Sequence, residues 1–320
     1  MMAIKNYAAI TMFVLSTLSL QAQKLKQNIN LGLNSEQTRE YSWDEDDEEY
    51  EEDTIKGFSF GLNVGVYFAN KKTAKFYNGA GSQNDFIDVN EVRGYSIQER
   101  LGATDNIFFD QTYNEVVQAV GNGATGFTVP FDSYPQNMRY NPAFLVGLHI
   151  KYNFNRYSAI IFNLNTIKLK TNSQFSLQFF GGPIPLNQQN DVRLFTITGN
   201  EQRFNLNLGY RQGWMMGDKS NIYLQAGGSM LGSQFEQNQL VLNESLTYDL
   251  FVGIQNQQIN LAAQQRTDVG FGGFGAIGFE FWFNDKYTMD LSFGLSRDKV
   301  VLYSLKENVM NKWLQATFTL

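Results

Sequence analysis

The chain has a single histidine, His149, and this is the side chain best suited to acid–base or nucleophilic chemistry. An acyl-transfer site that acts on lipids would pair it with a serine nucleophile. The residues after His149 are Ile150, Lys151 and Tyr152, so no serine stands two residues on along the same face. We therefore interpret His149 as a polar residue of the interior, and a lipid-modifying enzyme remains a third hypothesis.

In an extended strand, alternate side chains point to opposite faces. If the segments around them are strands, four charged residues point to the same interior face as His149. Two are cationic and two are anionic: Lys151, Arg211, Glu280 and Asp290. An isolated charge in an interior of low dielectric constant costs several kcal/mol, so charges buried there must pair. The pattern predicts a charge network that closes the interior. A thin hydrated pore is the alternative, because many glycines face the same way: Gly61, Gly65, Gly147, Gly209, Gly227, Gly270, Gly278 and Gly294.

Other motifs give no catalytic or metal site. The segment GFGGFGAIG (270–278) lies within an alternating apolar stretch and opens no helix, so it is not a nucleotide-binding loop. The acidic run DEDDEEYEED (44–53) lacks the spaced ligands and the glycine of a calcium loop. The chain has no cysteine, which excludes thiolate metal sites and disulfides. We expect no cofactor and no metal. The net charge of −6 comes mainly from the acidic run, and the slightly basic remainder gives no support for a nucleic-acid partner.

The elements that would position these side chains are strands with strict period-two alternation. In FGAIGFEFWFNDKYTMDLSFGLS (274–296), two apolar faces are joined by a turn at Asn284. Each apolar face spans about ten residues, which is the length that a tilted strand needs to cross a bilayer. The alternation recurs in eight segments: 58–68, 144–154, 160–165, 204–214, 222–230, 269–283, 287–296 and 314–320.

These segments predict an all-β fold, an eight-stranded antiparallel transmembrane β-barrel with long extracellular loops. Tight turns are expected near residues 155, 218 and 285, and long loops at 70–140, 172–200, 232–265 and 304–311. Short turns on one side and long loops on the other place both termini in the periplasm. A secreted β-sandwich also has alternating strands, but it would not need so many glycines on its polar face.

The first long loop, 70–140, carries more apolar residues than a bare connection needs. The segment IFFDQTYNEVVQAVGNG (107–123) has helical spacing and ends in glycines, which predicts a short helix. Its apolar side chains must be buried, either in a cap over the barrel or against another protein. The residues that we propose for partner binding are Phe108, Phe109, Phe127 and Phe131.

The N-terminal region precedes the barrel and divides into two parts. Residues 1–22 have the short cationic start, the apolar core and the small residue before the cut of a signal peptide. Residues 23–56 form an acidic tail, which is either a solvated periplasmic linker or a docking segment for a basic partner. The barrel then occupies residues 57–320.

Residues 57–320 resemble the small outer-membrane β-barrel proteins of the OmpA/OmpX-like type, particularly those of Bacteroidota. The more specific pieces of this resemblance are QAQ (21–23) at the end of the signal peptide and the C-terminal WLQATFTL (313–320). The resemblance implies a place in the outer membrane and no enzymatic activity. It also implies that the barrel-assembly machinery reads the last strand, through Phe318 two residues before the terminal Leu320.

Two functions remain alongside the enzyme hypothesis. In the first, the barrel is a non-enzymatic accessory or scaffold subunit of an outer-membrane complex for protein assembly, secretion or motility. Protein partners would then bind through loop 70–140 and the acidic tail. In the second, the barrel is a small porin or a surface receptor for a small ligand.

Overall fold

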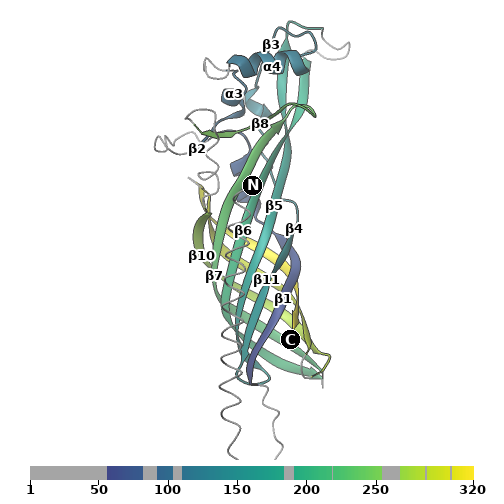
Figure 1. Cartoon of the computed structure of the whole chain (residues 1–320), viewed down its shortest axis with the longest axis vertical. Helices are drawn as coiled ribbons and strands as arrows, with labels where there is room; N and C mark the ends of the chain where they lie inside the picture. Colours follow the sequence, from purple (N-terminus) through teal and green to yellow (C-terminus); the bar gives the residue numbers. More distant parts are fainter. Residues whose placement is uncertain are drawn as a thin grey trace, which may run out of the picture. The chain divides into compact units, whose positions relative to one another are not determined.

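The computed structural model of the chain describes residues 56–81, 92–103, 110–183, 191–217, 219–253, 267–284, 287–302 and 305–320 (Figure 1). The predicted signal peptide, the acidic tail before Lys56, and both Phe108 and Phe109 lie outside these residues. Within the described residues, no helix has both the length and the apolar character required to span a membrane.

Eight long strands form a closed antiparallel ring, which confirms the predicted fold class. In chain order they are β1 (Gly57–Phe68), β4 (Ala143–Asn153), β5 (Ser158–Phe180), β6 (Asp191–Gly217), β7 (Ser220–Val241), β10 (Thr267–Trp282), β11 (Thr288–Leu302) and β12 (Leu305–Thr319). Chain neighbours pair in sequence, β7 pairs with β10, and β12 pairs with β1 to close the ring. The eight strands lie at the eight segments that the alternation predicts.

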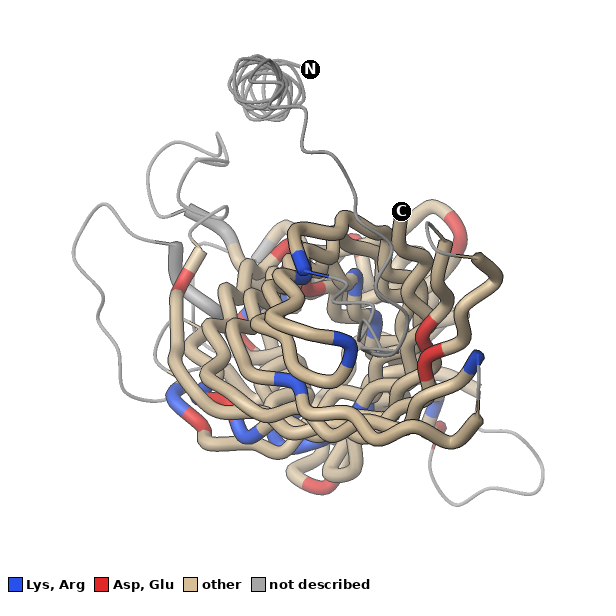
Figure 2. Tube along the Cα trace, turned by 90° about the horizontal axis from the view of Figure 1, so that it is seen from below, with Lys and Arg blue, Asp and Glu red and all other residues tan. Residues whose placement is uncertain are grey.

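The alternation sorts the side chains between the two faces of the wall. The outward residues are mostly large and apolar, such as Phe58, Phe271 and Leu314, and they are exposed. The inward residues are mostly buried, and they include most of the polar residues of the wall together with bulky side chains such as Trp313. A view along the barrel shows that most of the wall carries no charge (Figure 2). An apolar outer surface around a polar interior is the arrangement of a barrel that spans a bilayer.

Inward glycines make room for bulky side chains in a narrow lumen. The indole of Trp313 lies directly against Gly294 on the neighbouring strand, where any Cβ would collide with it. The glycine at this position is therefore explained by close packing within the barrel.

Three of the predicted loops are wrong in extent, because strands continue into them. The prediction of a loop at 172–200 fails because β5 and β6 pair as far as Phe179 with Asp191. At 232–265, β7 continues to Val241, and the short strands β8 (Thr247–Asp249) and β9 (Phe251–Gly253) follow. At 304–311, β12 already begins at Leu305, which pairs with Leu302. In these extensions the outer face is largely polar, which explains why the apolar alternation does not reveal them.

The segment 70–140 contains a series of short elements. These are α2 (Lys71–Ala74), a 3₁₀ turn η1 (Lys75–Tyr77), β2 (Val92–Gly94), α3 (Ile97–Arg100), α4 (Asp110–Val120), β3 (Gly126–Thr128) and η3 (Phe131–Ser133). The helix α4 lies within the segment that helical spacing indicated. Strand β3 pairs with the far end of β5, and β2 pairs with β9. Together with β8 and β9, these elements form what we call the cap.

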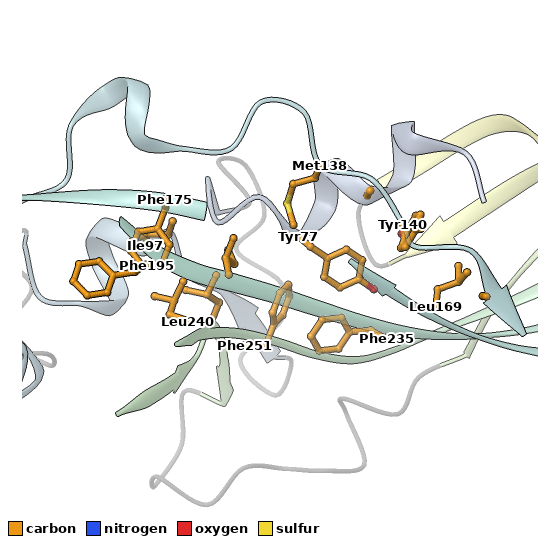
Figure 3. Packing of buried hydrophobic residues seen from close by; sticks show 14 of the residues in the cluster. Tyr77, Ile97, Met138, Tyr140, Leu169, Phe175, Phe195, Phe235, Leu240 and Phe251 are labelled. Atoms are coloured by element: carbon orange, nitrogen blue, oxygen red, sulfur yellow. The ribbon is translucent and has the colours of Figure 1, made fainter. Parts of the chain in front are cut away.

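The cap has its own hydrophobic core, built against the inner face of the extended β5, β6 and β7 (Figure 3). On β5 the inward residues change from Asn163 and Asn165 to Ile167 and Leu169, so the apolar core of the cap begins on this strand beyond Asn165. The ring of Phe235 on β7 lies 5.9 Å from that of Tyr77 and 4.4 Å from that of Phe251. The apolar residues of segment 70–140 therefore cover the barrel of their own chain.

We expect Phe235→Ala to loosen the cap without opening the ring of strands. Phe235 is fully buried among aromatic rings, and removing such a side chain costs about 3–5 kcal/mol. Hydrogen exchange should accelerate in α2 and in 242–253, while the amides of the β1–β12 pair stay protected. The control Phe271→Ala removes an outward ring of the same size, and exchange in the cap should not change in that variant. Equal exchange in both variants would contradict the cap core described here.

Candidate functional site in the barrel lumen

The four charges predicted to face inward meet in one cluster near the tight turns. Lys151 on β4 forms an ion pair with Glu280 on β10. Arg211 on β6 donates to Asp290 on β11 at 2.9 Å and lies 3.6 Å from Glu280. All four side chains are buried. The guanidinium of Arg211 also lies 3.8 Å from the ring centroid of Tyr223. This lower cluster joins four strands across the lumen.

A neutral polar layer follows above the lower cluster, and it contains His149. The Nδ1 atom of His149 lies 2.6 Å from Oδ1 of Asn163, and the amide of Asn63 donates to both Asn163 and Asn165 at 3.0 Å. Three buried atoms of this layer have no hydrogen-bond partner among the described residues: Nε2 of His149, Oδ1 of Asn205 and Oδ1 of Asn207. Buried polar atoms require a partner, so this layer is suited to water or a small polar ligand.

A second ion pair, which the sequence reasoning missed, lies at the upper end of the lumen. Arg203 and Glu201 are both fully buried, and Nε of Arg203 donates to Oε1 of Glu201 at 2.6 Å. The cap segments complete the shell around this pair. Thr73 accepts from Arg203 at 3.0 Å, and the hydroxyl of Tyr140 donates to Glu201 at 2.6 Å. The first loop therefore enters the lumen and bonds to the wall through a buried charge.

A buried carboxylate on β11, Asp298, was also missed. It accepts hydrogen bonds from Ser229 at 2.5 Å, from Ser296, and from the amide of Asn311 at 3.0 Å. The same amide side chain accepts at 3.1 Å from the backbone N–H of Asn70, where the first loop begins. Asp298 is an even number of residues from Asp290, and Arg203 from Arg211, so each pair shares the inward face of its strand. Extending the alternation further along β11 and β6 would have placed Asp298 and Arg203 in the lumen.

The polar contacts of the cap tie its short elements together outside the membrane-spanning strands. The hydroxyl of Tyr248 on β8 donates to Glu115 on α4 at 3.0 Å, and Arg100 on α3 donates to the carbonyl of Asp249 at 2.8 Å. Burial, and then the neighbouring Glu115, raise the pKa of Tyr248. The tyrosine therefore stays a neutral hydrogen-bond donor.

A cavity of about 440 Å³ lies at the end of the lumen beside the tight turns. Its wall includes Lys151 and Glu280 of the lower cluster, together with Lys56, Arg156 and Trp282. The guanidinium of Arg156 lies 4.8 Å from the ring centroid of Trp282. The ion pair between Lys151 and Glu280 therefore forms part of the wall of this cavity.

The remaining predicted residues lie away from the lumen. Phe127 is buried between Tyr113 and Phe179, with ring centroids 4.6 and 5.8 Å away, so its assignment to partner binding is wrong. Phe127 is instead part of the cap core, in which the apolar side chains of segment 70–140 pack. Phe131 is 96% exposed. Phe318 and Leu320 face outward at the end of β12, where Phe318 pairs with Leu62 and Met289.

We expect Arg203→Met to destabilise the protein by about 3–5 kcal/mol, because it leaves Glu201 buried without its cation. The double variant Glu201→Met/Arg203→Met should recover most of that loss, since apolar residues of similar volume replace a buried ion pair at little cost. Denaturant unfolding in detergent micelles measures both free energies. A double variant as unstable as the single one would show that the cap hydrogen bonds matter more than the unpaired charge.

No family model matches the chain, and no curated protein matches its sequence. Among solved structures, the chain is similar to Neisserial surface protein A, with 9% identity, a TM-score of 0.38, and coverage of 82% of this chain and 96% of that chain. It is also similar to Ail, the attachment invasion locus protein of Yersinia pestis, with 8% identity, a TM-score of 0.30, and coverage of 83% and 99%. For the outer membrane protein OprG from Pseudomonas aeruginosa the identity is 9%, the TM-score 0.32, and the coverage 82% and 93%. Because these identities and TM-scores are low, the function has to be argued from the geometry of the chain itself.

Proposed function

We propose that this protein is a non-enzymatic outer-membrane β-barrel that serves as an accessory or scaffold subunit of a larger complex for protein assembly, secretion or motility. In this proposal the tight turns and both termini face the periplasm, and the cap faces the outside. The barrel-assembly machinery would read the outward Phe318 and Leu320 on the last strand during insertion. The acidic tail would provide a second contact on the periplasmic side.

The closed lumen argues against transport as the main role. The lower cluster crosses the lumen with ion pairs among Lys151, Glu280, Arg211 and Asp290. The cap fills the opposite end with an apolar core and with hydrogen bonds to Glu201. A solute would have to break charge-assisted hydrogen bonds in a buried setting at one end and displace the cap at the other.

The observation that carries the subunit proposal is an apolar surface at the far end of the β5–β6 hairpin. Phe180, Val192 and Leu194 are exposed there on the outer face, and we call them the tip patch. On β6 the tip patch is separated from the apolar belt of the wall by Thr196, Thr198, Asn200 and Gln202. At about 3.3 Å per residue, a strand carries the tip patch well beyond the bilayer surface, where lipid cannot cover it. Apolar residues held in water on a rigid hairpin are typical of a protein-binding surface.

The test is co-purification from membranes extracted in mild detergent, with an affinity tag inserted in the acidic tail so that the last strand stays intact. We expect stoichiometric recovery of other outer-membrane proteins with the wild type. The variant Val192→Ser/Leu194→Ser should lose them, because it removes apolar contact area at the tip patch.

The matched control is Thr198→Ser/Gln202→Ser, which alters the same outer face of β6 below the tip patch and should retain the partners. Recovery of the barrel alone from wild-type membranes would contradict the subunit role.

The second candidate is a small porin or a surface receptor for a small ligand. The cavity near the tight turns and the unpartnered polar atoms around His149 favour it. We expect no discrete conductance steps from the wild-type protein in planar bilayers, because the lower cluster and the cap both close the lumen. Conductance steps that grow in Lys151→Ala would favour the porin over the subunit.

A further inference from the structure

The outer surface of the barrel carries a group of cations immediately beyond the apolar belt on the cap side. On β5 the outward residues after Leu164 and Thr166 are Lys168 and Lys170. On β11, Arg297 and Lys299 follow Leu295, and on β12 Lys312 precedes Leu314. The five side chains are all exposed. We call these five residues the basic flank.

The strand register brings the two cationic edges of the flank onto one side of the ring. Lys312 pairs with Leu295 on β11 and with Phe68 on β1. Arg297 is opposite Met310, which makes it a diagonal neighbour of Lys312. The strands β11, β12, β1, β4 and β5 are consecutive in the ring, and Phe144 of β4 lies between the two edges with 63% of its surface exposed.

The strands β6 and β7 lie on the other side of the ring, and their described residues carry no outward cation beyond the apolar belt on the cap side. Beyond the apolar belt, the outward residues there are Asn200 and Gln202 on β6 and Glu236 on β7. The apolar belt there includes Met230 on β7, which pairs with Leu206 on β6. Strand β10 borders the flank, because Gly272 pairs with Asp298, the residue before Lys299. The two sides of one barrel therefore meet the bilayer surface with different charge.

No ion pair within the described part of the chain accounts for the five cations. None of them forms an ion pair with another described residue. Like charges on neighbouring strand positions repel each other, so the folded chain alone gains nothing from this arrangement. Their level, just outside the apolar belt, is the level at which the headgroups of the surrounding lipids lie.

We infer that the basic flank binds the phosphate groups of anionic lipid headgroups on the cap side of the bilayer. Phe144, Phe68 and Leu314 lie next to the cations and would pack against the acyl chains of the same lipids. The inference rests on the membrane placement used in the proposed function but not on the subunit role. A purified barrel can therefore test it without any partner.

The experiment compares two tryptophan reporters in a chain whose four native tryptophans, Trp43, Trp214, Trp282 and Trp313, are replaced by Phe. Phe144→Trp reports from the basic flank, and Met230→Trp reports from β7, which lies two strands from β5 and two strands from β11 in the ring. Each protein is reconstituted in vesicles of brominated phosphatidylglycerol mixed with phosphatidylcholine, and then in the converse mixture with brominated phosphatidylcholine. Quenching by each brominated lipid gives its relative affinity at each reporter.

We expect an excess affinity for phosphatidylglycerol at position 144 and none at position 230. Lys168→Gln/Lys170→Gln should reduce that excess by up to about five-fold for each cation removed, and added salt should reduce it too. The control Lys56→Gln/Lys219→Gln removes two cations at the opposite end of the barrel and should leave it unchanged.

Equal affinities at the two reporters, or an excess that survives Lys168→Gln/Lys170→Gln, would overturn the inference. Saturable binding of inorganic phosphate that abolishes the excess would assign the flank to a free anion instead, and would also overturn it. Circular dichroism of each variant establishes that the strands have formed before quenching is measured.

Discussion

The structure depends on the closure of its backbone hydrogen bonds into a ring. A strand inside a bilayer has no water to satisfy its N–H and C=O groups, so an open sheet edge there would cost several kcal/mol for each unpaired group. The β7–β10 and β12–β1 pairs remove both edges. Once the ring is closed, successive side chains of each strand point to opposite faces of the wall, so each one faces either the lipid or the lumen. The apolar outer wall and the polar interior both follow from this closure of the backbone hydrogen bonds.

The lumen then has to be filled without leaving a buried charge unpaired. The protein solves this in three layers: the lower cluster, the neutral layer around His149, and the pair formed by Glu201 and Arg203. The uppermost layer is completed by Thr73 and Tyr140 from outside the ring. Barrel and cap are thus one bonded unit, in which the long loop replaces the solvent that would otherwise enter. The same hydrogen bonds that satisfy a buried carboxylate also connect the cap to the wall.

Strict alternation made much of this predictable from the sequence. Parity was sufficient to place Lys151, Arg211, Glu280 and Asp290 on the lumen side, because a strand has only two faces. Parity could not give the length of β5 and β6, since beyond Leu164 and Phe204 the outer face becomes polar and the apolar signal fades. Glu201 and Arg203 were missed for that reason. The burial of Phe127 depends on contacts with Tyr113 and Phe179, which are distant in sequence and leave no local pattern.

The pairing of β12 with β1 also determines the order of events in folding. Leu62 and Phe318 are neighbours in the wall although almost the whole barrel sequence lies between them. The ring cannot close until the final strand is available, so every earlier intermediate exposes at least one unpaired edge and a sheet with one greasy face. Long-range pairing of this kind is slow and exposes the chain to aggregation in the meantime. For this chain, protection during delivery to the membrane is therefore a structural requirement that comes from its topology.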